Sequence, residues 1–215
     1  MGRHISSPAF IPGHAAQSGK WLTGEMIRAM TAADFRAVQD LERAAGELFR
    51  EAGMESIADD EPFTDAELAT FVSEDWAWVL TVPDDGAAGE AGESEHDDAA
   101  SRVPATREAV VAYAVGEVVD GAAHLEQLSV HPRHGRQGLG ARLLEHFRTA
   151  ARERGMGRVS LTTFSEIPWN AAYYARLGFT VLPGEDWGPG LRAKVAAEAA
   201  HGLDRWPRVA MVAEA

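Results

Sequence analysis

The chain has 215 residues, 46% of them hydrophobic and 25% charged, and its 33 acidic and 20 basic residues give a formal net charge of -13. This length allows one domain with a sizeable core, or two very small ones. The negative charge disfavours nucleic-acid binding through phosphates and favours cationic small molecules as partners.

The residue types that are missing exclude further classes of protein. There is no cysteine, which excludes disulfides, thiolate metal sites and a cysteine nucleophile. The eight histidines are scattered without paired metal-ligand spacing, so we predict no metal site. No apolar run reaches the length of a membrane span, and the N-terminus lacks an apolar signal core. We therefore expect a cytoplasmic protein with no membrane contact.

The first part of the chain changes from an irregular to a regular pattern. Residues 1–24 are rich in Gly, Ser, Pro and His and predict a flexible arm, whereas residues 25–215 predict one domain. Thr64 and Glu67 form a capping box, which marks a helix start. The predicted elements up to this point are a strand at 26–30, a helix that starts at Thr31 to Asp34, a helix at 64–73 and a strand at 76–82.

Residues 84–106 differ in composition from their surroundings. Large apolar side chains are absent from 84 to 102, and residues 84–98 hold seven acids and no Lys or Arg. We predict a solvated acidic loop inserted between two strands of a hairpin. Because these seven charges belong to the loop, the rest of the chain carries only -6 of the total of -13.

The second half alternates strands and helices. Asp120-Gly121 predicts the turn of a hairpin, and a Gly-rich stretch at 134–140 precedes a strongly amphipathic helix. The apolar face of that helix is Leu139, Leu143, Leu144, Phe147 and Ala151. The predicted elements are strands at 110–118, 124–130, 159–164, 179–182 and 208–212, and further helices at 170–177 and 191–201. This order indicates an α/β fold with a central sheet and helices on both faces.

The Gly-rich turn has the composition of an anion site. A strand, a glycine turn and a helix N-terminus bring backbone N–H groups together beside a partial positive charge. The sequence lacks the Lys-Ser/Thr ending of a P-loop and the third glycine of a dinucleotide fingerprint. What remains is a phosphate site of another kind, with Arg133 and Arg136 as nearby cations, or a plain Gly-rich connector.

Two spaced segments resemble the GNAT acetyltransferase superfamily. Residues 128–144 look like its strand, pyrophosphate loop and long helix, and residues 168–179 are similar to its late Asn…Tyr…Gly-Phe segment. The resemblance covers residues 26–182. It implies a mixed, mostly antiparallel, twisted sheet of about six or seven strands, splayed at strands 4 and 5. Residues 183–215 would then be a C-terminal extension that closes the acceptor side or joins a partner in a homodimer.

The resemblance also implies a reaction and its cofactor contacts. The expected reaction transfers an acetyl group from acetyl-CoA to a primary amine of a small molecule or peptide. The loop departs from the family pattern, because Gly135 stands where Arg or Gln is usual and Arg136 follows it. Asn170 matches the asparagine that binds the pantetheine arm, although it could equally cap a helix. The other implied cofactor residues are Leu128, Ser129, Val130, Arg136, Gln137, Gly138, Leu139, Gly140 and Ala141.

Two side chains are candidates for the proton transfers. Glu126 lies just before the cofactor segment and is the predicted base, directly or through water. His124 is two residues away on the same face and is the alternative base, while a structural role for Glu126 stays open. Tyr174 is the predicted acid for the leaving sulfur, since a phenol has a higher pKa than a thiol. The adjacent Tyr173 is the competing choice.

Two other functions fit the same pattern. One is a non-catalytic acyl-CoA-binding module on this fold, and the other is an interaction protein that has lost the cofactor. Trp76, Trp78 and Trp169 predict core or pocket wall rather than a platform for nucleic-acid bases. The sequence leaves open which amine is accepted.

Overall fold

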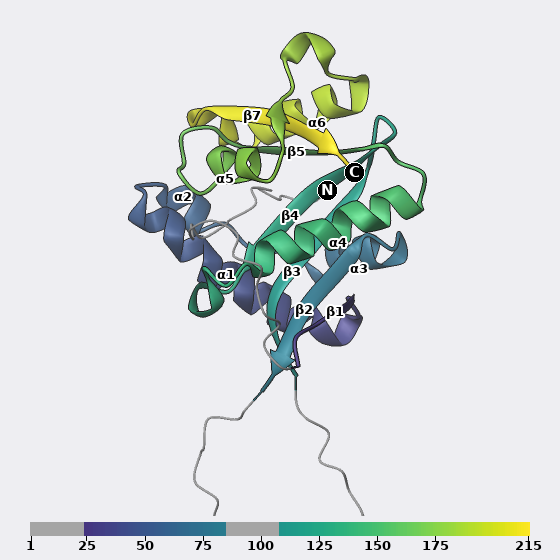
Figure 1. Ribbon diagram of the computed structural model, residues 1–215. Helices are drawn as coiled ribbons and strands as arrows, with labels where there is room; N and C mark the ends of the chain where they lie inside the picture. Colours follow the sequence, from purple (N-terminus) through teal and green to yellow (C-terminus); the bar gives the residue numbers. More distant parts are fainter. Residues whose placement is uncertain (1–23, 85–107) are drawn as a thin grey trace, which may run out of the picture.

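A computed structural model describes residues 24–84 and 108–215. Most of the predicted arm (1–23) and of the predicted acidic loop (85–106) lies outside these residues. The strands form one sheet in the order β1-β2-β3-β4-β5-β7-β6 (Figure 1). Their bounds are β1 Met26–Ala29, β2 Ala77–Pro83, β3 Glu108–Val119, β4 Ala122–Val130, β5 Arg158–Phe164, β6 Thr180–Val181 and β7 Arg208–Glu214.

Neighbouring strands are antiparallel except for β4 and β5, which run parallel. Helices cover both sides of the sheet (Figure 1). The helix bounds are α1 Phe35–Glu51, α2 Glu55–Ala58, α3 Asp65–Ser73, α4 Leu139–Glu153, α5 Ala171–Arg176 and α6 Pro189–Ala200. The predicted fold class is therefore confirmed. None of the helices in the described ranges combines the length and apolar character that a membrane crossing requires.

The two faces of the sheet are named here after the helices that cover them. The α4 face, covered by α4 and α5, packs the predicted apolar stripe of α4 against Trp76, Trp78 and the buried side chains of β3 to β5. The α1 face is covered by α1, α3 and α6. Both tryptophans are thus core residues, as predicted.

Local sequence signals position several of these elements. Glu67 N–H donates to Thr64 Oγ1 at 3.3 Å, and Thr64 N–H donates to Glu67 Oε2 at 2.8 Å, which is the predicted capping box. Asp120 and Gly121 have φ of 50° and 79°, the left-handed pair that a two-residue β-hairpin turn needs. The strands on either side of the acidic loop pair as expected, with Pro83 opposite Glu108.

β4 separates from β5 almost at once. The two strands pair only at Ala123–Val159 and His124–Ser160 and then diverge. On the other edge of β4, Gly116 of β3 lies opposite Leu125 and its neighbour Val115 lies opposite Gln127. Glu126 is therefore the extra residue of a β-bulge. The predicted splay between strands 4 and 5 is confirmed, and the bulge lies at its mouth.

Gly116 makes the bulge sterically feasible. A Cβ at this position would lie 2.5 Å from the carbonyl oxygen of His124 and 2.6 Å from the Phe147 ring. A larger residue would displace the β4 backbone or the Phe147 ring, so Gly116 allows β3, β4 and α4 to approach closely next to the bulge.

Residues 183–215 supply α6 and β7. β7 pairs with β5 over seven residue pairs and lies between β5 and β6, although β6 precedes it in sequence. The Asp120 carboxylate accepts the N–H groups of Gly190 and Leu191, both at 2.9 Å. These bonds fasten the start of α6 to the β3–β4 turn and so place α6 over the α1 face.

Candidate active site

The Gly-rich turn connects β4 to the N-terminus of α4. Gly138 precedes the helix with a φ of 78°, a left-handed conformation that favours glycine, and no side chain caps the helix. Arg136 is also left-handed, with a φ of 64°. The first N–H groups of a helix have no partner within it, so they point into the turn. Arg133, Arg136 and Gln137 are exposed beside them. This is the geometry of an anion site.

The open edge of β4 offers its backbone rather than its side chains. Leu128 and Val130 are buried in the core of the α4 face, and Ser129 is buried on the α1 face. Beyond His124 none of these residues pairs with β5. Their backbone groups on that edge are therefore available to a ligand lying in the gap between the strands.

Helix α5 contributes two buried polar side chains without partners. Asn170 and Tyr174 are each 0% exposed, and within residues 24–84 and 108–215 neither amide atom of Asn170 nor the Tyr174 hydroxyl has a hydrogen-bond partner. Asn170 is the N-cap residue of α5, but its side chain makes no capping hydrogen bond. Buried polar groups of this kind are costly, and a pantetheine-like chain of amides would satisfy them.

Tyr174 is held in a wholly apolar environment. Its ring contacts the rings of Tyr173 and Phe179, with centroids 5.3 and 5.6 Å away. Burial raises the pKa of Tyr174 well above its usual value. The phenol therefore keeps its proton across the physiological range, as a proton donor requires.

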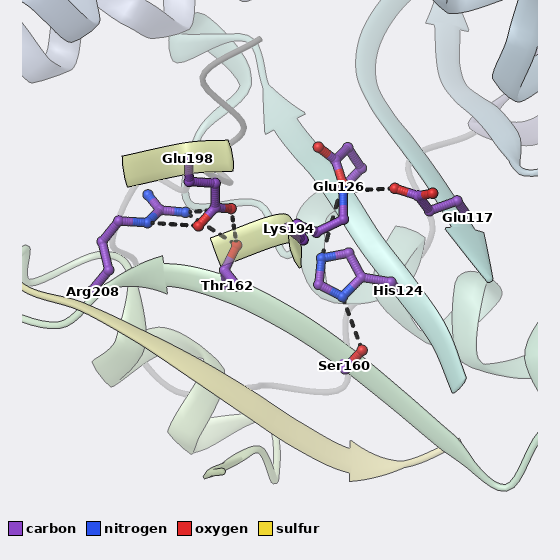
Figure 2. Close-up of polar contacts among 8 residues, drawn as sticks. All are labelled: Glu117, His124, Glu126, Ser160, Thr162, Lys194, Glu198 and Arg208. Atoms are coloured by element: carbon purple, nitrogen blue, oxygen red, sulfur yellow. Dashed lines mark hydrogen bonds and ion pairs between the residues drawn. The ribbon is translucent and has the colours of Figure 1, made fainter. Parts of the chain in front are cut away.

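Glu126, the predicted base, is paired with a lysine that the sequence analysis did not single out. Lys194 of α6 places its Nζ 2.5 Å from Glu126 Oε2 and 2.6 Å from Glu117 Oε1 (Figure 2). The Lys194 side chain is only 17% exposed. Burial lowers the pKa of Lys194, but Glu126 and Glu117 outweigh it, and the pKa is raised overall. One ammonium ion thus serves two carboxylates.

His124 lies on the same side of β4 as Glu126, as predicted. It is 1% exposed, its Nδ1 lies 2.9 Å from Ser160 Oγ, and its Nε2 lies 3.9 Å from Glu126 Oε2 (Figure 2). Burial lowers the pKa of His124 to about 4. The ring is therefore neutral at pH 7 and is a weaker base than an ordinary histidine.

A second buried ion pair lies one turn further along α6. Arg208 of β7 holds Glu198 with Nη2–Oε1 at 3.0 Å and Nε–Oε2 at 3.2 Å, and the Thr162 hydroxyl donates to the same carboxylate (Figure 2). Lys194 and Glu198 are four residues apart, so they share one face of α6. The helix therefore lays two charged side chains over the α1 side of the β4–β5 gap.

Within the described residues, no group of three or more His, Asp or Glu side chains could hold a metal ion.

Comparison with known sequences identifies the class of protein. The profile of the Acetyltransferase (GNAT) family matches residues 67–179, more than half of the chain, and the chain belongs to this family. The match begins in α3 and ends just after α5, so it includes the Gly-rich turn, the splayed strands, Asn170 and Tyr174.

Solved structures with the same fold come from several organisms. The ribosomal-protein-S18-alanine N-acetyltransferase from Escherichia coli is 18% identical, with 88% of this chain and 93% of that chain covered and a TM-score of 0.51. Ard1 from Thermoplasma volcanium is 17% identical, with coverages of 89% and 98% and a TM-score of 0.56. The PaiA N-acetyltransferase from Thermoplasma acidophilum, in complex with coenzyme A, is 12% identical, with coverages of 90% and 100% and a TM-score of 0.54. At these identities the likeness is one of fold.

Proposed function

We propose that this protein transfers an acetyl group from acetyl-CoA to a primary amine of a small molecule or peptide by direct attack on the thioester. The observation that carries the proposal is the separation of β4 from β5 directly beside the Glu126 bulge. The resulting gap has the α4 N-terminus beyond the end of β4 and a carboxylate at its mouth. Membership of the acetyltransferase family and the coenzyme A complex of a structural neighbour support the same conclusion.

The residues present fit acetyl-CoA, which would supply the acetyl group as a thioester. The backbone N–H groups of Arg136, Gln137, Gly138, Leu139, Gly140 and Ala141 would bind the pyrophosphate. The buried amide of Asn170, which has no protein partner, would bind the pantetheine arm. The open backbone edge at Leu128, Ser129 and Val130 would bind the arm and orient the thioester carbonyl.

Two residues would move the protons of the reaction. Glu126 would accept a proton from the acceptor ammonium, directly or through water, once the amine competes with Lys194 for the carboxylate. Tyr174 would donate a proton to the departing sulfur. The ammonium first loses one proton to become the attacking amine. As the carbon–nitrogen bond forms and the carbon–sulfur bond breaks, the nitrogen loses a second proton. These two protons balance the one that the thiolate takes up and the one that is released to solvent.

Calorimetry with acetyl-CoA, followed by a panel of amines with detection of free thiol, tests the proposal. Tyr174→Phe should lower turnover on the order of 10- to 100-fold with little change in acetyl-CoA affinity. The neighbouring Tyr173→Phe is the matched control and should retain most turnover. Unchanged turnover in Tyr174→Phe would reject its role. Acetyl-CoA binding without thiol release would indicate a non-catalytic acyl-CoA-binding module. The absence of acetyl-CoA binding would indicate an interaction protein.

A further inference from the structure

A small cavity on the α1 face lies between α1, α2 and β4, apart from the Lys194 ion pairs. Its volume is about 40 Å³. The polar part of its lining is Glu42, Asp60, Glu61, Gln127 and Ser129, and no Lys or Arg lines it. The lining therefore carries three carboxylates without a basic residue, which favours a cation as the ligand.

Glu42 faces the core from the middle of α1. It lies four residues after Val38 and three before Ala45, so it occupies the stripe of α1 that is otherwise buried and apolar. The N–H of Phe63 donates to Glu42 Oε2 at 3.2 Å. Among the described residues, no Lys or Arg lies within ion-pair distance of this carboxylate. Glu42 thus differs from Glu126, which already holds a lysine.

The surroundings of Glu42 make its ionised form costly. Burial raises the pKa of Glu42 to about 8, the charge of Asp60 adds to this rise, and Arg43 opposes it. Tyr113 faces Glu42 from β3, and burial together with the Glu42 charge raises the pKa of Tyr113 well above its usual value. A bound cation would stabilise the carboxylate that the protein leaves without a counter-ion.

Gln127 gives independent evidence for a ligand that carries hydrogen-bond donors. It is 5% exposed, and its Nε2 donates to Ser129 Oγ at 3.0 Å. Its Oε1 is buried and has no hydrogen-bond partner in the part of the chain that the structure describes. Gln127 lines the cavity and follows the bulge residue Glu126 directly, so this acceptor lies beside the splayed part of β4. An unsatisfied buried acceptor of this kind calls for an N–H or O–H donor.

We infer that the cavity binds the terminal primary ammonium group of the acceptor through Glu42, Gln127 and Ser129. This inference rests on the proposed function and names its substrate class. An alkylammonium ion carries three N–H donors, which match the carboxylate, the amide oxygen and the remaining lone pair of the hydroxyl oxygen. At about 10–15 Å³ for each water-sized position, the cavity accommodates the ammonium and one or two methylenes.

The rest of the lining selects the shape of the ligand. Phe49 and Ile57 supply apolar walls, and Gly46 lets α1 approach α2 closely. These walls and the volume of about 40 Å³ favour an unbranched aliphatic chain beside the ammonium over a branched carbon. A diamine bound here by one ammonium would leave its other nitrogen to react at Glu126, the base of the proposed function.

Equilibrium binding of simple amines to the full-length protein tests this site without acetyl-CoA. The probes are butylammonium, 1,4-diaminobutane, the branched tert-butylammonium and the uncharged butan-1-ol. We expect calorimetry to show tighter binding of the two unbranched ammonium ions than of the other two probes. Binding should also strengthen from pH 7 to pH 9 as Glu42 loses its proton, because burial raises the pKa of Glu42 to about 8 and the pKa of Tyr113 lies well above its usual value. The other charged groups beside Glu42 are Asp60, Glu61 and Arg43.

Matched variants identify the residues responsible. Glu42→Gln should weaken butylammonium binding at least tenfold and Gln127→Leu severalfold. Glu47→Gln should have no effect, because Glu47 is exposed on the same helix and pairs with Arg50. Thermal unfolding of each variant confirms that it folds. Equal binding of butylammonium and butan-1-ol, or equal binding by Glu42→Gln and Glu47→Gln, would overturn the inference.

Steady-state kinetics with acetyl-CoA then separate this inference from the proposed function. Glu42→Gln should raise KM for 1,4-diaminobutane more than KM for butylamine, because only the diamine can hold one nitrogen in the cavity while the other reacts at Glu126. A wild-type protein that turns over amines while Glu42→Gln and Glu47→Gln remain equal refutes the site alone. A wild-type protein that binds amines but not acetyl-CoA refutes the proposed function.

Discussion

The two faces of the sheet differ in how they use the same strand. On the α4 face, β4 contributes Leu125, Leu128 and Val130 to an apolar core that includes Trp76 and Phe147, whose rings lie 5.1 Å apart. On the α1 face, β4 carries polar side chains that meet charged residues from α1, β3 and α6. Successive residues of a strand point to opposite faces of the sheet, which separates the two sets of side chains. The extra residue at the Glu126 bulge shifts this alternation by one position.

This difference suggests a division of labour. The α4 face has open backbone groups and two buried polar side chains, which would suit the neutral pantetheine arm and thioester of the proposed donor without counter-charges. The α1 face is rich in carboxylates, which suits an amine that arrives protonated and must lose a proton. Substitutions on one face should therefore leave the property of the other face unchanged, and the following predictions test that separation.

The largest effect is expected for Arg208→Met on the α1 face. Loss of the guanidinium leaves Glu198 buried without its cation, which should lower the free energy of unfolding by about 3–5 kcal/mol. Urea denaturation measures this change. Arg158→Met, at the exposed start of β5, is the matched control and should stay within about 0.5 kcal/mol of wild type. Acetyl-CoA affinity of the folded Arg208→Met protein should be unchanged, and a large loss would contradict the separation of faces.

The pH dependence of stability should reveal Glu42. Its pKa in the folded protein, about 8, lies above the unfolded value of 4.5, so its contribution is favourable below pH 4.5 and is lost as the pH rises through 8. Glu42→Gln removes this loss. The variant should gain about 4 kcal/mol relative to wild type between pH 5 and pH 9, at about 1.4 kcal/mol per pKa unit. Denaturant unfolding across pH measures it, and a flat difference between the two proteins would contradict it.

A smaller effect is expected where Lys194 serves two carboxylates. The Glu126 side chain is 11% exposed and the Glu117 side chain 37%, although both lie at similar distances from Lys194. Double-mutant cycles with Lys194→Met should therefore give about 1–2 kcal/mol of coupling to Glu126→Gln and less than about 1 kcal/mol to Glu117→Gln. Equal couplings would show that burial does not distinguish the two ion pairs.

The smallest effect is expected at the Gly-rich turn on the donor side. Gly138→Ala forces a side chain into the left-handed region and should cost about 1–2 kcal/mol of stability, with a severalfold loss of acetyl-CoA affinity. Gly157→Ala is the control, because Gly157 has open space and no left-handed φ. Amine binding should be the same in both variants. If the Gly138→Ala protein binds acetyl-CoA like the control, the turn is not the pyrophosphate site.

Local signals made much of the fold predictable. The Thr64–Glu67 box, the Asp120-Gly121 turn and the apolar stripe of α4 each depend on residues within a few positions of one another, so backbone geometry alone decides them. Glu42 also left a local sign, as a charged residue in an otherwise apolar stripe of α1. The sequence shows this charged residue. The cavity beside it, however, also depends on Gln127 of β4, and Tyr113, which faces Glu42, belongs to β3.

The sequence by itself determined the elements, the family resemblance and the position of Glu126, Asn170 and Tyr174 along the chain. Only the tertiary structure decided that β7 lies between β5 and β6, and that Lys194, 68 residues after Glu126, reaches its carboxylate. It also decided that the Asn170 side chain is buried at the start of α5 without making a capping hydrogen bond. The physical reason is that periodicity and capping act over one or two turns of chain. Ion pairing and burial depend instead on which distant elements the sheet brings together.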